Sequence, residues 1–379
     1  MTKSDYIILG AGASGLLLAY RMANDSFFDE TSIVIIDKVK DKGNDRTWCF
    51  WEEGLGEWDS ILHKSWSSVY FGSDFISKQI DIKPYKYNMI RSASFYDLLW
   101  KTISEKSNIS FQQAEVSGLQ SIENKVVVET KSGQFEASKV FNSLLFDDSY
   151  KTQTKFPVLQ QHFIGWFIKT ETPQFDAEVA TFMDFEIPQQ GNTRFMYVLP
   201  TSKTEALFEY TLFSKELLPK AAYETAIKDY LDKKGIKDYT ITETEMGSIP
   251  MTCYEFSKQN TKNILHIGTA GGWTKASTGY TFMTTTKKTK ALVEFLKTEA
   301  NISKFAKRTK FWYYDLLMLD VLASDNSYGA KLFSSLFKNT KVTTIFKFLD
   351  EESTLIQDLK IITSVPSWPF IKVLFKRLF

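Results

Sequence analysis

The fold of this chain is decided by its stretch Asp5-Tyr6-Ile7-Ile8-Leu9-Gly10-Ala11-Gly12-Ala13-Ser14-Gly15. The apolar run does not alternate with polar residues, which predicts a buried parallel strand. Gly10 permits a tight turn, Gly12 lets the backbone approach a pyrophosphate, and Gly15 lets a helix pack on the strand. Residues 16–22 have helical composition, and a helix N-terminus offers free N–H groups to phosphates. The stretch therefore predicts a dinucleotide-binding turn.

A second apolar strand is expected at residues 32–36, and it ends in Asp37, 22 residues after Gly15. A carboxylate at this place accepts a hydrogen bond from a ribose 2′-hydroxyl and disfavours a 2′-phosphate, which argues against NADP in this site. The order of strand, glycines, helix, strand and acid favours dinucleotide binding over an ordinary strand–turn–helix. NAD and FAD both remain open from these residues alone.

The composition is that of a globular protein. The chain has 379 residues, of which 43% are apolar, and its 46 Lys and Arg against 45 Asp and Glu give a net charge of +1. This length predicts two or three domains, and the balanced charge argues against a nucleic-acid partner. Aromatic residues make up 15% of the chain. Such a surplus suits either a large apolar ligand or a bulky core.

Cysteine and histidine are too few for a metal site. The two cysteines and three scattered histidines provide neither a disulfide framework nor zinc-ligand spacing. The apolar run near the N-terminus is too short for a secretory signal, and no stretch reaches the roughly 18 apolar residues of a membrane span. We therefore expect a metal-free protein in the cytoplasm or on a membrane surface.

The remaining sequence patterns give a coarse map. We expect a helix at 95–106 capped by Ser94, a strand at 109–112, a hairpin of 125–130 with 134–138, strands at 163–169, 179–186, 194–199 and 205–212, a helix at 217–234, a buried strand at 264–267 and helices after 284. The expected fold class is α/β (α+β overall), a Rossmann-type nucleotide-binding domain with an inserted antiparallel-sheet substrate domain. The expected domain boundaries are 1–150 and 256–300 for the nucleotide-binding domain, 151–255 for the inserted sheet and 301–379 for a helical C-terminal region.

Several short motifs lie between these elements. They are Asp45-Arg46-Thr47-Trp48-Cys49-Phe50-Trp51, Met183-Asp184-Phe185, Phe195-Met196-Tyr197-Val198-Leu199-Pro200, Phe208-Glu209-Tyr210-Thr211, Gly247-Ser248-Ile249-Pro250-Met251, Gly268-Thr269-Ala270-Gly271, Ser277-Thr278-Gly279-Tyr280 and Phe348-Leu349-Asp350-Glu351. Their order and content over nearly the whole chain resemble the lycopene β-cyclases, carotenoid cyclases of the type found in flavobacteria-like bacteria.

The resemblance implies a flavoprotein with an aromatic-hydroxylase-like fold and a helical C-terminal region. It implies an intramolecular lyase that converts the ψ ends of lycopene to β-ionone rings without net redox change. It also implies FAD in the reduced form and NAD(P)H as the reductant. The chain departs from many relatives at Lys275-Ala276, where they carry His-Pro, so the sequence leaves the flavin contacts of the loop 272–276 open. Thr269 stands where hydroxylases of this fold usually have Asp.

The cyclisation chemistry independently requires an acid. An isolated alkene is a poor base, so its protonation needs a carboxyl group kept neutral by a raised pKa, and aromatic faces can stabilise the resulting cation. Glu209 lies among apolar neighbours in a strand, where its side chain shares a face with those of Leu207 and Thr211. The essential acidic motif of the family falls on Glu209, whereas the residue pattern alone also fits a solvated strand glutamate.

Other residues are candidates by their place in the motifs. The expected cofactor-binding residues are Gly10, Gly12, Gly15, Asp37, Arg46, Thr47, Gly268, Thr269, Gly271 and Gly279. The expected substrate-lining residues are Trp48, Asp184, Phe195, Tyr197, Trp273 and Tyr280. Tight turns and an ordinary aromatic core are the alternative explanations for these residues.

Three other functions share parts of this pattern. An FAD-dependent monooxygenase would add oxygen to its substrate, a geranylgeranyl-reductase-like enzyme would add hydrogen, and a carotenoid or lipid carrier would catalyse nothing. The cyclase motifs and the missing Asp at Thr269 argue against the first, the mass of the product would distinguish the second, and the intact glycines with Asp37 argue against the third. The sequence leaves open whether one or both ends of lycopene are cyclised, which carotenoids are accepted and what the oligomeric state is.

The C-terminal region is the expected membrane-docking surface. Residues 331–379 carry eight basic residues against four acidic ones. A helix over 370–379 would put Phe370, Leu374 and Leu378 on one face with Lys372 and Lys376 opposite, the pattern of a helix lying in a membrane interface. The alternative is a C-terminal helix packed on the body of the protein.

Overall fold

The first sheet is built around β1 (Thr2–Leu9), the strand expected from the opening apolar run. The structure, a computed structural model, describes residues 2–146 and 148–378. In this sheet the strands follow the order β8 (Ile109–Gln113), β2 (Ile33–Asp37), β1, β11 (Gly133–Asn142), β10 (Lys125–Thr130) and β9 (Val116–Ile122), and β17 (Ile264–His266) also pairs with β11. The strands β8, β2, β1, β11 and β17 pair in parallel, whereas β9, β10 and β11 pair antiparallel.

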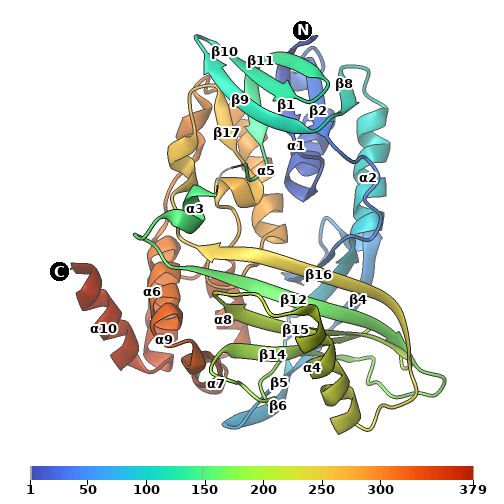
Figure 1. Ribbon diagram of the computed structural model, residues 1–379, viewed down its shortest axis with the longest axis vertical. Coiled ribbons are helices and arrows are strands. Elements are labelled where there is room, and N and C mark those ends of the chain that lie inside the picture. Colours follow the sequence, from blue (N-terminus) through green and yellow to red (C-terminus); the bar gives the residue numbers. More distant parts are fainter. Residues whose placement is uncertain (1, 147, 379) are drawn as a thin grey trace.

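Three helices cover one face of this sheet (Figure 1). They are α1 (Ala13–Ala23), α2 (Ser92–Ser104) and α5 (Phe282–Leu296). Leu16, Leu99 and Leu292 are fully buried in one cluster between the helices and the sheet. Ile7 and Ile36 point to the opposite face, where the strands β9–β11 bury them. Because both faces are covered, the central strands contain apolar residues without alternation.

The second sheet also has seven strands and is mostly antiparallel. Its strands follow the order β16 (Thr240–Thr252), β12 (Val158–Lys169), β15 (Glu205–Ser214), β14 (Thr193–Pro200), β13 (Val179–Asp184), β5 (Ser68–Ser73) and β6 (Ile76–Asp81). One face packs on α4 (Lys220–Lys233), which buries Trp166, Phe208 and Ile227 in one cluster. Alternate residues of the same strands therefore point to the other face, toward the C-terminal helices.

The C-terminal region is helical, as Figure 1 shows. Its helices are α6 (Lys310–Ser324), α7 (Gly329–Asn339), α8 (Val342–Leu349), α9 (Leu355–Ser364) and α10 (Ser367–Leu378). A small sheet of β3 (Thr47–Glu53), β7 (Tyr85–Arg91) and β4 (Leu62–Trp66) joins the two halves. The short helix α3 (Ser149–Thr152) leads from the first sheet into β12. The expected Rossmann-type half, second sheet and helical C-terminal region are therefore confirmed as the architecture.

Two expectations from the sequence need correction. Ser94 does not cap α2, because the helix already begins at Ser92 and Arg91 occupies the capping position. Residues 68–81 were assigned to the nucleotide-binding segment 1–150, but they form β5 and β6 of the second sheet, where β5 pairs in parallel with β13. A pairing between strands more than 100 residues apart leaves no local trace in the sequence.

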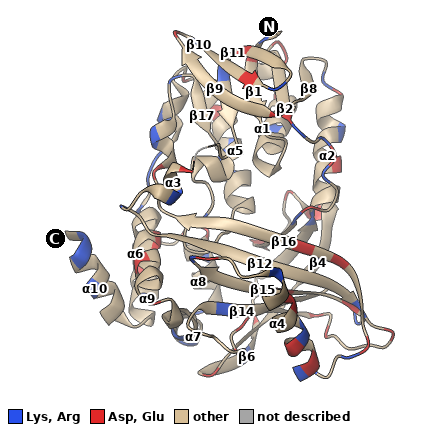
Figure 2. Ribbon diagram, in the orientation of Figure 1, with Lys and Arg blue, Asp and Glu red and all other residues tan. Residues whose placement is uncertain are grey.

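Acidic and basic residues are distributed along the chain in both halves, and basic residues lie on α10 (Figure 2). Among residues 2–146 and 148–378, no helix combines the length and the apolar character needed to cross a membrane.

Candidate active site

Two adjoining cavities lie between the halves of the molecule. The first, of about 550 Å³, is lined by the turn after β1 and the end of β2. The second, of about 420 Å³, is lined by the inner face of the second sheet and by helices α7 and α8. Arg46, Trp48 and Thr269 line both cavities. A ligand bound in the first cavity would therefore meet a ligand bound in the second.

The turn after β1 is shaped by glycines in different ways. Gly10 has a left-handed backbone with φ of +93°, a conformation that side chains disfavour. A side chain on Gly15 would overlap the carbonyl oxygen of Gly10, whereas a Cβ on Gly12 would meet nothing within 4 Å. The missing side chain of Gly15 thus allows the start of α1 to pack closely against the turn. The missing side chain of Gly12 leaves the backbone accessible from the cavity.

Asp37 joins this turn to the end of β2. Its Oδ2 accepts hydrogen bonds from the Ala11 amide at 2.6 Å and from Lys42 Nζ at 3.1 Å. The carboxylate also lines the first cavity. We call the Gly10–Gly15 turn together with Asp37 the nucleotide cradle. Its open backbone and buried acid fit the phosphate and ribose of a dinucleotide.

A row of four residues crosses the inner face of the second sheet. Glu209 on β15 lies directly opposite Tyr197 on β14 and opposite Gly165 on β12. Gly165 in turn lies opposite Glu245 on β16. Directly opposed residues of neighbouring strands point to the same face, and both glutamates line the second cavity. We call Tyr197, Glu209, Gly165 and Glu245 the carboxyl row.

Gly165 leaves the space between the two carboxyl groups. A Cβ at this position would lie 3.5 Å from Glu209 Cβ, 3.3 Å from Glu245 Cγ and 2.9 Å from Leu207 Cδ1. Any larger residue would therefore separate the glutamates or displace Leu207. The two acids are neighbours because the residue between them has no side chain.

The environment of Glu209 keeps it protonated. Burial and the nearby Glu245 carboxyl raise the pKa of Glu209 from 4.5 to about 8. Thr211 Oγ1 donates a hydrogen bond of 2.6 Å to Glu209 Oε1 and opposes part of this rise. Burial raises the pKa of Glu245 too, but the hydrogen bond from Thr47 and the charge of Arg91 oppose that rise. At neutral pH the row therefore contains a neutral carboxyl group able to donate a proton.

Neutral phenols and a thiol surround the acid. The hydroxyl groups of Tyr87 and Tyr197 are hydrogen-bonded at 2.5 Å. Burial raises the pKa of the Cys49 thiol to about 12 and the pKa values of Tyr87, Tyr197 and Tyr280 above their ordinary range. These groups stay uncharged and weakly nucleophilic. Their rings offer apolar faces to a cation in the cavity.

Most residues expected from the sequence line one of the cavities. The nucleotide cradle residues Gly10, Gly12 and Asp37 line the first cavity, and Thr47, Phe195, Tyr197, Glu209, Gly279 and Tyr280 line the second. The hydroxyl of Thr47, an expected cofactor-binding residue, donates a hydrogen bond of 2.7 Å to Glu245 Oε2.

Other expected residues lie outside both sets of lining residues. Asp184 was expected to line the substrate site, but it accepts a hydrogen bond of 2.7 Å from Tyr230 on the α4 side, because a register shift in β13 turns it to the other face. Trp273 was also expected there, but it is buried in the core with Leu292. Gly15, Gly268 and Gly271 shape turns: side chains on the last two would overlap Ser14 and the His266 carbonyl, respectively.

The divergent loop 272–276 is tied to the C-terminal helices. Lys275 is buried, and its Nζ lies 3.0 Å from Asp315 and 3.5 Å from Glu351. Ser277 Oγ donates to the same Asp315 at 2.7 Å. Through Glu351, the Phe348–Glu351 motif helps to anchor this loop. The loop leads into Gly279, which lines the second cavity.

Sequence reasoning missed Glu245, Gly165 and Tyr87. Glu245 lies two residues before the Gly247–Met251 motif, which was the one signal available for it. Its place beside Glu209 depends on the register of β16, β12 and β15, and that register is not written in any single segment. Within the described ranges 2–146 and 148–378, no three His, Cys, Asp or Glu side chains gather as a metal site would require.

Comparisons with known proteins agree with this architecture. Lycopene beta-cyclase of Pantoea ananas is 26% identical over 256 residues, which are 65% of this chain and 62% of that protein. This chain thus aligns with less than two thirds of the curated relative.

Two solved structures share the fold. A geranylgeranyl bacteriochlorophyll reductase-like protein of Thermoplasma acidophilum has a TM-score of 0.69 at 12% identity, over 99% of both chains. A variant of the halogenase PltM in complex with FAD has a TM-score of 0.56 at 11% identity, over 97% of this chain and 85% of that one.

The family model described as "Lycopene cyclase protein" matches residues 5–375. This chain therefore belongs to the lycopene cyclase protein family.

Proposed function

We propose that this protein is a lycopene β-cyclase, an isomerase of the intramolecular lyase type. It would convert the ψ ends of lycopene to β-ionone rings and so form β-carotene by way of γ-carotene. The observation that carries the proposal is Glu209, a buried carboxyl group with a raised pKa that faces an aromatic cavity. Family membership supplies the substrate class.

Glu209 initiates the reaction as a general acid. Its O–H bond breaks as a C–H bond forms at the terminal double bond of lycopene, which leaves a tertiary cation. The C5–C6 double bond attacks this cation and closes the ring, and loss of a ring proton gives the β ring. Mass and oxidation state are unchanged. Burial of Glu209 excludes water that would otherwise trap the cation.

The aromatic walls of the cavity stabilise the positive charge. Phe163, Phe195, Tyr197 and Tyr280 line it, and ring faces attract a cation without adding to it. The phenol groups of Tyr197 and Tyr87 are hydrogen-bonded to each other, which makes their oxygens poorer nucleophiles toward the cation. The site thus combines a proton donor with a non-nucleophilic cage.

We infer that the nucleotide cradle holds FAD. The unobstructed backbone at Gly12 and the carboxylate of Asp37 fit the pyrophosphate and ribose, and the halogenase of the same fold is in complex with FAD. Arg46 and Thr269 line both cavities and would lie beside its flavin end. Reduced FAD, with NAD(P)H as the reductant, would supply an electron-rich ring next to the developing cation.

We also propose that the protein docks on the cytoplasmic face of the membrane, because lycopene is insoluble in water. Helices α7 and α8 line the second cavity, and α9 packs on both. Four apolar side chains of α9 are exposed, Leu355, Ile356, Leu359 and Ile362. On α10 Leu374 and Leu378 are also exposed. This apolar face lies close to the cavity that would receive the polyene.

The docking face differs from the one expected at the sequence level. Phe370 was expected beside Leu374, but it packs against the buried cluster of Val321, Leu332 and Val373. Arg377, one of the eight basic residues of this region, forms an ion pair with Asp320 at 2.7 Å. The expected helix over 370–379 is seen as α10, Ser367–Leu378, and Phe379 lies outside the described residues.

The test is expression in a lycopene-accumulating bacterium followed by chromatography and mass spectrometry of the pigments. We expect β-carotene or γ-carotene with the mass of lycopene. A product heavier by one oxygen would instead show a monooxygenase, and a product heavier by hydrogen would show a reductase. Unchanged lycopene in the presence of flavin-loaded protein would overturn the proposed function.

A further inference from the structure

Glu245 is a buried carboxyl group to which the chemistry above gives no role. It is 8% exposed, like Glu209, and both lie on the same face on either side of Gly165. Because burial disfavours two adjacent negative charges, such a pair retains a proton that the two groups share.

The surroundings of the pair are asymmetric. Glu245 Oε2 accepts a hydrogen bond of 2.7 Å from Thr47 Oγ1, and the positive charges of Arg91 and Arg46 act on Glu245. Glu209 instead faces the neutral groups described above, and its hydrogen-bond donor is the hydroxyl of Thr211. Donors and cations stabilise a carboxylate, and a dry neutral environment stabilises the acid. The proton therefore belongs on Glu209 and the negative charge on Glu245.

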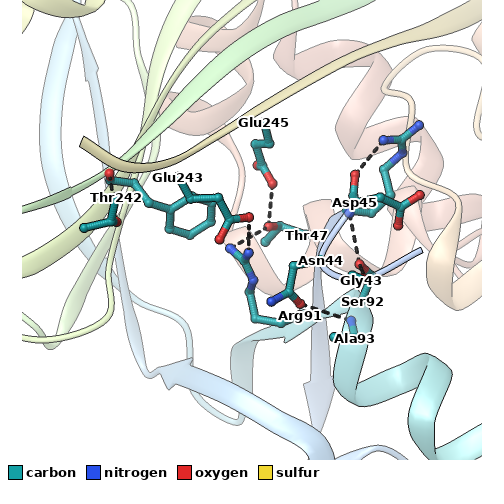
Figure 3. A network of polar contacts seen from close by, with 12 residues as sticks. Gly43, Asn44, Asp45, Thr47, Arg91, Ser92, Ala93, Thr242, Glu243 and Glu245 are labelled. Carbon is teal, nitrogen blue, oxygen red and sulfur yellow. Dashed lines mark hydrogen bonds and ion pairs between the residues drawn. The ribbon is translucent and has the colours of Figure 1, made fainter. Parts of the chain in front are cut away.

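Figure 3 shows how the charged side is held in place. Arg91 Nη1 lies 3.5 Å from Thr47 Oγ1, and Nη2 forms an ion pair with Glu243. The guanidinium group also lies 4.0 Å over the ring of Phe167. Glu243 and the Phe167 ring hold the Arg91 guanidinium group in place. The Thr47 hydroxyl therefore accepts a hydrogen bond from Arg91 and donates its own to Glu245. Glu243, two residues from Glu245, adds a negative charge that Arg91 offsets.

We propose that Glu245 is the second carboxyl group of the reaction: as a carboxylate it holds the shared proton on Glu209, and it then accepts the proton that leaves the new ring. The proposal rests on the cyclase function above. The carbon that gains a proton and the carbon that loses one are both bonded to the same ring carbon, so two adjacent carboxyl groups can serve them.

The proton balance closes within the pair. Glu209 gives its proton to the terminal alkene carbon and becomes a carboxylate. After ring closure the C6–H bond breaks, its electron pair forms the C5–C6 double bond, and the proton passes to Glu245. The proton then returns from Glu245 to Glu209 across the space left by Gly165. No other proton donor or acceptor is consumed, in agreement with a reaction that leaves the mass unchanged.

The first test follows the proton rather than the activity. In infrared spectra of protein carrying ¹³C-labelled glutamate, the carbonyl band of a protonated buried carboxyl group should titrate with pH. We expect this band to disappear in Glu209→Gln. In Glu245→Gln it should remain, but it should titrate at lower pH, because the negative neighbour that raises the pKa of Glu209 is gone. An unchanged midpoint in Glu245→Gln would overturn the proposal.

The second test follows the ring type. When the proper acceptor is missing, the ring cation loses a proton from C4 or from the C5 methyl group, which gives ε or γ rings. We expect Glu245→Gln to cyclise lycopene about a hundredfold more slowly, the usual contribution of a positioned base, and to form a larger share of such rings. Only β rings at the wild-type rate would overturn the role of Glu245 as acceptor.

Matched variants guard against a trivial explanation. Glu205→Gln changes an exposed glutamate at the start of β15 that pairs with Lys169 at 3.1 Å, and it should alter neither the band nor the rings. If Glu245→Gln does not fold, Thr47→Val removes the donor to Glu245, and Thr47→Ser restores it. Equal rates and ring types for the Val and Ser variants would overturn the proposal. If the wild type fails to cyclise lycopene, the infrared titration still decides whether the pair shares a proton.

Discussion

The nucleotide cradle and the carboxyl row meet at one site, but they are built on opposite principles. The turn of the cradle is formed by six consecutive residues, and the groups that it offers to a ligand are mainly backbone N–H groups exposed by glycine. The carboxyl row takes one residue from each of four strands. In the cradle a missing Cβ admits a ligand, whereas at Gly165 a missing Cβ admits two acids. Binding thus depends on local geometry, and reactivity depends on the register of a sheet.

The largest effect is expected from a substitution that disrupts the carboxyl row and leaves the cradle intact. Glu209→Gln should lower the cyclisation rate by about 10²–10⁴-fold or abolish it, because an amide cannot deliver the initiating proton. FAD content and the unfolding midpoint should stay close to those of the wild type. The measurement is pigment chromatography together with a flavin absorption spectrum. Glu205→Gln is the control and should keep substantial activity; rapid ring formation by Glu209→Gln would remove this residue from the mechanism.

The next effect is a pH dependence confined to the row. Activity should fall about tenfold per pH unit above about 8, because the acid form of Glu209 disappears there. Burial and the neighbouring Glu245 raise the pKa of Glu209 from its ordinary 4.5 to about 8 in the folded protein, so the folded state binds an extra proton between these values. The free energy of unfolding should therefore fall as the pH rises through this window. Urea unfolding at several pH values measures it, and Glu209→Gln should show a flatter curve.

These two regions also differ in how far the sequence reveals them. The cradle could be predicted because Gly10, Gly12, Gly15 and Asp37 lie in two short segments. The spacing of these residues along the chain is enough to determine where they lie in the turn. Glu209 could be named only through a family resemblance, since apolar neighbours in a strand do not show which face is buried. The fold of the first sheet followed from its apolar runs. The pairing of β5 with β13 did not, because it joins strands more than 100 residues apart.

The contacts of Asp184, Thr47 and Glu245 escaped prediction for the same physical reason. The position of each side chain depends on a local irregularity or on a neighbouring strand: a register shift in β13 turns Asp184 away, and Thr47 meets Glu245 from 198 residues earlier in the chain. Strand alternation predicts the face of a side chain only while the register is regular. Contacts between distant strands therefore decided which polar residues entered the site.

A smaller effect is expected from the acid of the cradle. Asp37→Ala should weaken FAD binding by about 1.5–3 kcal/mol, the contribution of a charge-assisted hydrogen bond. It also removes the acceptor of the Ala11 amide, which Asp37 holds at 2.6 Å, so the turn itself should loosen. Flavin fluorescence titration of the apoprotein measures the affinity. Asp37→Asn, which keeps an acceptor oxygen, should lose less; equal affinity for the Ala variant and the wild type would contradict the assigned role.

Two alanine substitutions distinguish the glycine that the packing of the cradle requires from the glycine that ligand binding requires. Gly15→Ala places a Cβ against the Gly10 carbonyl oxygen, and such overpacking costs about 1–3 kcal/mol of unfolding free energy. Gly12→Ala meets no atom within 4 Å, so it should leave stability nearly unchanged and weaken FAD binding instead. Denaturant unfolding of both apoproteins, with flavin titration alongside, makes the comparison. If both variants lose equal stability, the division of roles between the two glycines is wrong.

The smallest expected effect lies outside both regions, on α10. Lys372 and Lys376 are exposed beside the apolar Leu374 and Leu378. Basic residues near an anionic lipid surface contribute about 1 kcal/mol each, so Lys372→Gln with Lys376→Gln should weaken binding to phosphatidylglycerol vesicles by about that much per substitution. Added salt should reduce the difference, since it screens charges at the surface.

The matched control moves the same charge change to α4 and its vicinity, with Lys228→Gln and Lys237→Gln, which are exposed but far along the chain from α10. Vesicle sedimentation measures binding, and circular dichroism checks that all variants are folded. The α10 pair should weaken sedimentation and the control pair should not. Cyclisation of detergent-dispersed lycopene should be unchanged in both, because α10 contributes no residue to either cavity. Equal losses for the two pairs would mean that the vesicles sense the overall charge and that the docking face lies elsewhere.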